Sequence, residues 1–426
     1  MRFSIRYFLF LILSIVFFNT IRSQSIYREI PNLAFVDKNT ENIIFPSGDT
    51  NAYEFLFNKL DRLIFEGEGN INILHMGGSH IQAGTFSNRI RANLLSSFPG
   101  ITSSRGLIFP FSAAKTNNPY NYKTTSTGIW DATRNVLREP KYPLGLSGMC
   151  IATSDSNATI SIKMRPNGEP FIYDFNKVYV LGYSDSGYVR VLLQIQDSIV
   201  VEGKYDSIAL AYCFELECFV DSFKLFFSKK DSLWEPFYLR GFWLDNGMPG
   251  ISYIDIGVNG ASVPSYLKCT YLEKDLNFVK PDLCIFSIGI NDASGADFDT
   301  VYFKNNYREL IRRIKTVSPD CMILFTTNND SYRKIGRRYA NNTNGVLAQK
   351  AFYSLAKQYN AGVWDLFSYM GGLTSIKKWE NHNLAQKDKV HFTSQGYLLL
   401  GDLVYNAIVR EYVRHLKNKH IIHGLE

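Results

Sequence analysis

Short, almost continuous apolar runs recur in two separate parts of the chain. They lie at residues 71–76, 282–289 and 321–327. Runs of this length without alternation are typical of strands that are covered on both faces, as in a parallel sheet. Segments with apolar residues at helical spacing follow the later runs, at 305–317 and 346–359, and another begins near Ser394. This order predicts an α/β sheet with helices on both faces.

The spacing also assigns a buried face to each helix. In 305–317 it places Leu310 and Ile314 on that face, and in 346–359 it places Leu347, Ala351 and Leu355 there.

The pattern changes between about residues 146 and 245, where apolar and polar positions alternate. Ile160 and Ile162 belong to one such stretch, and Val191 and Leu193 belong to another. Short alternating strands with turns between them, and no helical pattern, predict an antiparallel β-sandwich.

We therefore predict an all-β module inserted into an α/β domain. The α/β domain is assigned to residues 71–145 and 246–426, and the module to 146–245. Residues 24–70 form a lead-in with a helix at about 52–65. The length of 426 residues agrees with more than one folding unit.

The first 23 residues read as an export signal. Arg2 and Arg6 provide a basic start, and the apolar run 7–18 is shorter than the roughly 20 residues that a membrane span needs. An uncleaved anchor is the alternative. No second long apolar run follows, so we expect a mature protein without a membrane span, in the periplasm or outside the cell.

Charge and cysteine content further limit the classes of protein that fit this sequence. The net charge of +7 is spread along the chain, so nucleic-acid binding is the weaker interpretation of its short basic stretches. No metal site is expected, because neither CxxC nor HExxH spacing occurs among the six cysteines and seven histidines. Cys213 and Cys218 could pair in an oxidising compartment.

Four short segments carry candidate chemistry. They are GGSH (77–80), DIGVNGAS (255–262), SIGIND (287–292) and DKVHFTSQGY (388–397). The first three come where a predicted strand ends, and the fourth precedes the last helix. Ligands of an open parallel sheet bind beyond the carboxyl ends of its strands, so these segments should meet at one edge.

In these four blocks and their order, the chain resembles the SGNH hydrolases, the superfamily that includes the GDSL esterases and lipases. The resemblance covers roughly residues 70–100 and 250–415 and implies a flavodoxin-like, three-layer α/β/α domain. It implies that Ser79 is the nucleophile, that His391 is the general base, and that Asp388 orients His391. No cofactor is implied.

The resemblance also implies an oxyanion hole, which is formed by the Ser79 N–H, the Gly260 N–H and the Asn291 side-chain amide. Two departures stand out. Gly78 occupies the position where the family usually has Asp, and the segment is not G-x-S-x-G, so the elbow of the α/β-hydrolases is not implied.

The chemistry of acyl transfer needs these residue types. A serine hydroxyl needs a base to remove its proton, and the imidazole needs a carboxylate to fix its tautomer. Asp388 precedes His391 by three positions, so one turn can join them. Taken singly, Ser79 could be a helix cap, Gly260 a turn glycine and Asn291 a turn residue.

Other polar residues near these segments have weaker assignments. His75 and His80 are taken as structural, with a pocket role open for His80. Asn328 and Asn329 follow the run at 321–327 and are assigned to a pocket lining.

Export and a β-module together suggest the substrate. An exported SGNH protein with an inserted sandwich resembles peptidoglycan O-acetylesterases and related carbohydrate esterases, so we predict removal of O-acetyl groups from cell-envelope or extracellular polysaccharide. One alternative is acetyl transfer to a sugar hydroxyl, and another is a carbohydrate-binding or surface-assembly protein with a vestigial site. A small ester substrate also fits, whereas a lipase fits less well, because no apolar lid stretch is present.

Overall fold

The computed structural model describes residues 25–419, except 99, 102, 165–170, 172, 188, 197, 229–234 and 336–337. The predicted export signal lies outside these residues. In the part of the chain that the structure describes, no helix combines the length and the apolar character that a bilayer crossing requires.

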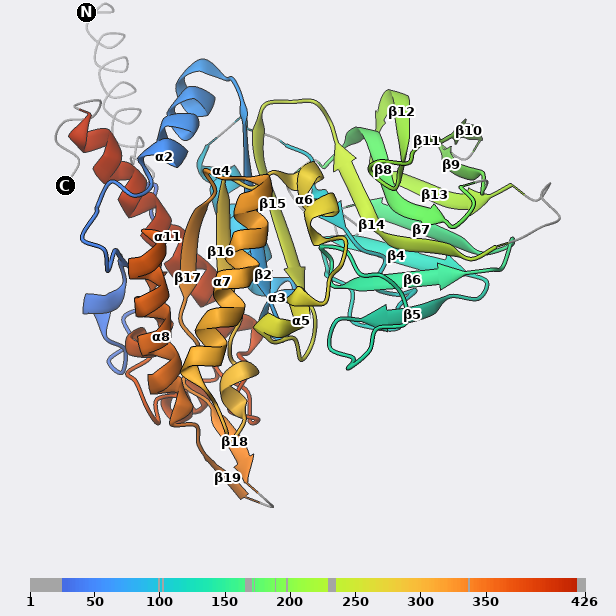
Figure 1. Cartoon of the computed structure of the whole chain (residues 1–426). Helices are drawn as coiled ribbons and strands as arrows, with labels where there is room; N and C mark the ends of the chain where they lie inside the picture. Colours follow the sequence, from blue (N-terminus) through green and yellow to red (C-terminus); the bar gives the residue numbers. More distant parts are fainter. Residues whose placement is uncertain are drawn as a thin grey trace, which may run out of the picture.

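A mostly parallel sheet forms the centre of the α/β domain (Figure 1). Its strands, in spatial order, are β1 (Ile43–Ile44), β20 (Gly362–Trp364), β17 (Met322–Thr326), β16 (Leu283–Ser287), β2 (Asn70–Gly77) and β15 (Gly250–Gly257). Only β1 runs antiparallel within this sheet, as an edge strand that the sequence pattern did not indicate. The predicted α/β fold class is confirmed.

Helices cover both faces of this sheet. One face is covered by α5 (Val263–Leu267), α6 (Leu272–Val279), α7 (Thr300–Val317) and α8 (Asn344–Tyr359), and the other by α2 (Glu54–Asp61), α4 (Thr85–Ser97) and α11 (Ser394–Asn418). Successive side chains of β2 divide between the two layers, because side chains alternate along a strand. Leu74 and Met76 pack with α7 and α8, whereas Ile71 and Ile73 pack with α4 and α11.

An antiparallel sandwich lies beside the α/β domain (Figure 1). One sheet has the order β10 (Ile199–Glu202), β9 (Val191–Ile195), β13 (Ser222–Phe227), β7 (Thr159–Met164) and β4 (Tyr122–Thr127). The other has the order β11 (Lys204–Asp206), β12 (Ala211–Val220), β8 (Phe175–Ser184), β14 (Phe237–Asp245), β6 (Met149–Thr153) and β5 (Asp131–Arg134), with β3 (Gly106–Ile108) also paired to β14.

The sandwich begins before residue 146, where the sequence pattern placed its start. Strands β4 and β5 lie ahead of that position, yet they pair with β7 and β6. Most side chains of both strands are exposed or partly exposed. β4 is rich in Thr and Ser and β5 has the sequence DATR, so neither shows the apolar alternation that marks the later strands.

A two-stranded hairpin extends from the α/β domain at the carboxyl edge of its parallel strands. It consists of β18 (Tyr332–Ile335) and β19 (Arg338–Asn341), and it follows β17 in the chain (Figure 1).

Candidate active site

A glycine pair sets the position of Ser79. Strand β2 ends at Gly77, and α3 (Ser79–Gln82) begins two residues later. A Cβ atom on Gly77 would lie 2.2 Å from Cγ1 of Ile81, so glycine lets this short helix start against the sheet. Ser79 is therefore held at the carboxyl edge of the sheet, as predicted from its place after an apolar strand.

Ser79, His391 and Asp388 form a continuous chain of hydrogen bonds. Ser79 Oγ lies 2.7 Å from His391 Nε2, although 312 positions separate the two residues. His391 Nδ1 lies 2.7 Å from Asp388 Oδ2. The geometry is that of an activated nucleophile with an oriented base.

Asp388 is fixed by its own loop before it meets the imidazole. Its Oδ1 accepts hydrogen bonds from the backbone N–H groups of Val390 (2.9 Å) and His391 (3.0 Å). Partial burial would by itself raise the pKa of the carboxyl group. The hydrogen bonds from His391 and Val390 outweigh burial and lower the pKa. Asp388 is thus held as the carboxylate that an imidazolium needs beside it.

Two neighbouring segments hold the loop that carries His391. Asn329 Nδ2 donates to the Val390 carbonyl oxygen at 2.9 Å, and the Tyr332 N–H donates to the Lys389 carbonyl oxygen at 3.0 Å. Lys389 has a φ of 56°, in the left-handed region that side chains other than glycine rarely adopt. These bonds favour the tight turn that brings Asp388 and His391 together.

The predicted oxyanion donors gather around the same turn. Asn291 Nδ2 would lie 3.4 Å from a Cβ atom on Gly78, which places the amide beside the nucleophile turn. One of its two N–H groups donates to the Ala261 carbonyl oxygen at 2.8 Å, so the second remains for a substrate. The Ser79 N–H is the first of α3 and has no partner within the helix. Gly260, with a φ of 83°, lies in the turn after β15.

Sequence reasoning missed two residues that support this arrangement. Gln82 Oε1 accepts the Asn259 N–H at 2.7 Å and so ties α3 to the Gly260 turn. Asp292 accepts the Val263 N–H at the start of α5, and burial raises its pKa to about 6. Asp292 stands next to Asn291 and Gln82 lies three positions after Ser79, and this closeness to candidate residues is the signal that could have indicated them.

His75 is a structural histidine, with both ring nitrogens in hydrogen bonds. They lie 2.7 Å from the Tyr253 hydroxyl and 2.7 Å from Ser287 Oγ. Burial lowers the pKa of His75 to about 3, so the ring is neutral at ordinary pH.

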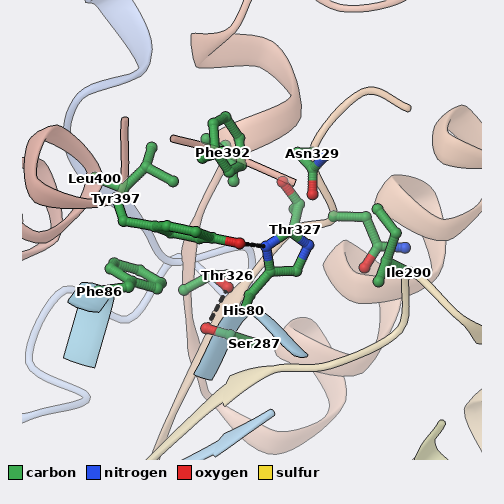
Figure 2. Close-up of a pocket in the computed structure, with 12 residues that line it drawn as sticks. His80, Phe86, Ser287, Ile290, Thr326, Thr327, Asn329, Phe392, Tyr397 and Leu400 are labelled. Atoms are coloured by element: carbon green, nitrogen blue, oxygen red, sulfur yellow. Dashed lines mark hydrogen bonds between the residues drawn. The ribbon is translucent and has the colours of Figure 1, made fainter. Parts of the chain in front are cut away.

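His80, Asn328 and Asn329 line one small cavity of about 30 Å³ (Figure 2). Ile290 and Phe392 also line it, whereas Ser79, Asp388 and His391 do not. His80 connects the cavity to the hydrogen-bonded chain, because its ring also lies 5.1 Å from the ring of His391.

Other candidate chemistry finds no support among the described residues. Within them, no group of three or more His, Cys, Asp or Glu side chains is arranged to hold a metal ion. Cys213 and Cys218 are both free thiols. They lie on one strand, β12, roughly 16 Å apart by strand rise, far beyond disulfide reach.

Comparison with known proteins defines the class. Residues 236–399 match the GDSL-like Lipase/Acylhydrolase family. Together with the fold, this match supports a serine hydrolase of the SGNH type that acts on ester bonds. The sequence matches none of the curated proteins with which it was compared.

Solved structures extend the similarity beyond the matched segment. A peptidoglycan O-acetylesterase superposes with a TM-score of 0.71 and 18% identity, over 87% of this chain and 99% of the other. The acetyl xylan esterase AlAXEase aligns over 37% of this chain and 81% of its own, with 21% identity and a TM-score of 0.30. A GDSL-like lipase from Bacteroides thetaiotaomicron covers 37% and 76%, with 21% identity and a TM-score of 0.30.

Proposed function

We propose that this esterase is exported and removes O-acetyl groups from cell-envelope or extracellular polysaccharide through an acetyl-Ser79 intermediate. The observation that carries the proposal is the unbroken hydrogen-bond chain from Ser79 through His391 to Asp388. Such a chain supports an active site over the vestigial site of a binding protein.

The reaction follows from the position of each group. His391 Nε2 takes the Ser79 proton as Oγ attacks the acetyl carbon, and Asp388 stabilises the imidazolium. The carbonyl oxygen becomes an oxyanion, which the Ser79 and Gly260 N–H groups and the Asn291 amide receive. The sugar oxygen leaves with the proton from His391. Water, activated by the same imidazole, then releases acetate and restores Ser79.

Two observations support a polysaccharide substrate. The chain carries a β-sandwich beside the catalytic domain, and such modules often face sugars. Its similarity to the peptidoglycan O-acetylesterase spans 87% of the chain, so the similarity includes the sandwich as well as the catalytic domain.

The basic, apolar start of the chain supports export.

The decisive experiment measures acetate released from O-acetylated cell-wall glycan by the purified protein, beside the Ser79→Ala variant. We expect release with the wild type and none with the variant. A burst of p-nitrophenol from p-nitrophenyl acetate should show the same difference. Loss of acetyl groups from the glycan without free acetate, but with a newly acetylated sugar, would indicate a transferase instead. Retention of glycan with no turnover of either substrate would indicate a binding protein.

A further inference from the structure

The residues that follow Ser79 and His391 in the chain also lie together. His80 is next to Ser79, and Phe392 is next to His391. Their ring centroids are 5.9 Å apart, and the rings of His80 and His391 are 5.1 Å apart. A second contact between the nucleophile turn and the base loop therefore lies beside the Ser79–His391 hydrogen bond.

Tyr397, in the first turn of α11, adds a polar link to this contact. Its hydroxyl lies 2.7 Å from His80 Nδ1, as Figure 2 shows, and the residue is 5% exposed. This hydrogen bond links α11 to the residue that follows Ser79.

The other nitrogen of His80 faces the small cavity. His80 Nε2 is buried and has no hydrogen-bond partner among the described residues. Within the part of the chain that the structure describes, the hydrogen bond with the Tyr397 hydroxyl is therefore the side-chain contact that orients this imidazole.

His80 is also suited electrostatically to a place beside the base. Burial, and then the neighbouring His391, lower the pKa of His80 to about 3. A neutral ring does not repel the positive charge that His391 acquires when it takes the Ser79 proton.

We propose that His80 and Tyr397 are positioning residues for the His391 base. Together they connect the Ser79 turn to the loop that ends at Phe392, and so keep Ser79 Oγ and His391 Nε2 within hydrogen-bond distance. This inference rests on the proposed catalytic role of Ser79 and His391.

The Tyr397→Phe variant tests the link with the least disturbance, because it keeps the ring and removes only the hydroxyl. We expect kcat for p-nitrophenyl acetate to fall on the order of 10–100-fold, with KM within about twofold, since small displacements of reacting groups have effects of this size. Covalent labelling of Ser79 by a fluorophosphonate should slow in parallel, because it also depends on activation of Oγ.

Tyr253→Phe is the matched control. The Tyr253 hydroxyl makes the same 2.7 Å bond to a buried histidine, His75, which does not contact His391. We expect this variant to keep the wild-type kcat, whatever its effect on thermal unfolding. An unchanged kcat in Tyr397→Phe, or an equal loss of kcat in both variants, would overturn the proposal.

A double-mutant cycle tests the connection itself. If Tyr397 acts through His80, the double variant His80→Phe with Tyr397→Phe should lose no more kcat than His80→Phe alone. Losses that multiply would show two independent effects and reject the link. If the wild type has no esterase activity, the proposed function fails. If only the Tyr397 effect is missing, the positioning role alone fails.

Discussion

The proposed catalytic residues differ in how much of their geometry is local. Asp388 and His391 are three positions apart, and backbone N–H groups of the same turn bind the carboxylate. Their pairing could therefore be predicted from spacing alone. The contact between Ser79 and His391 joins distant parts of the chain. The strand ends predicted that the two segments meet at one edge of the sheet, and the resemblance to a family implied the pairing of these two residues.

At this scale we predict that Asp388→Asn lowers kcat on the order of 10²–10⁴-fold with little change in KM. An amide at this position favours the wrong tautomer of the imidazole and cannot stabilise its charged form. Steady-state kinetics on p-nitrophenyl acetate measure the effect. A variant whose kcat is close to that of the wild type would show that Asp388 does not assist His391 as the base.

At the scale of elements, the pattern identified α7, α8 and α11 but not α4, and it did not always assign the buried face correctly. In α8, Leu347 is 43% exposed, so its predicted burial is wrong, whereas the predicted Ala351 and Leu355 are buried. Ala348 and Phe352 complete the buried face. The reason is that α8 packs on the sheet and on α7 through Phe352. The predicted buried face included Leu347 instead of Phe352.

Close packing of two elements gives a second prediction. A Cβ atom on Gly257, at the end of β15, would lie 2.4 Å from the Gln82 backbone nitrogen and 2.6 Å from the Gly78 carbonyl oxygen. Gly257→Ala should therefore displace the nucleophile turn, destabilise the fold by about 1–3 kcal/mol and lower kcat.

Gly295→Ala is its control. A Cβ atom there would meet no atom within 4 Å, and its φ of −71° suits any residue. Urea unfolding and kcat should both remain close to wild type. Equal effects of the two substitutions would contradict a steric cause.

The Asp292 cap of α5 predicts a pH dependence of stability. Its pKa is about 6 in the folded chain because of burial, against an ordinary value of 3.8. Between these values the folded chain holds a proton that the unfolded chain has lost, so this contribution to stability is complete below about pH 4 and is lost as pH rises through 6. The total change is about 3 kcal/mol.

The Asp292→Asn variant removes this titration. Its free energy of unfolding, relative to the wild type, should increase by up to about 3 kcal/mol between pH 4 and pH 7. A relative stability that does not vary with pH would show that Asp292 ionises normally.

At the scale of the whole molecule, the sandwich and the α/β domain share their interior. One continuous cluster of buried side chains includes Phe242 of β14, Ile254 of β15 and Leu74 of β2. A cluster of buried charged side chains also connects these parts of the chain. Asp255 on β15 accepts hydrogen bonds from Arg91 of α4 and from Arg105, which directly precedes β3.

Loss of this carboxylate should destabilise the whole protein. Asp255→Ala leaves two buried guanidinium groups without the carboxylate that neutralises their charge. We expect a loss of about 3–5 kcal/mol in the free energy of unfolding. Asp131→Ala removes a surface partner of Lys141, with both side chains about half exposed, and should change stability by less than about 1 kcal/mol. Chemical denaturation of both variants measures the difference, and equal losses would show that the buried cluster is not a link.

The sequence by itself indicated the main strands of the α/β sheet, the three later long helices and the candidate residues at the strand ends. Apolar periodicity records which side of a helix or strand is covered, and a spacing of three positions is enough to place Asp388 beside His391. The tertiary structure alone decided the contacts between side chains from distant segments. It brought Ser79 to His391, set Gln82 against the Gly260 turn and joined β4 and β5 to the sandwich. These contacts depend on how distant elements pack together, and local periodicity carries no information about that packing.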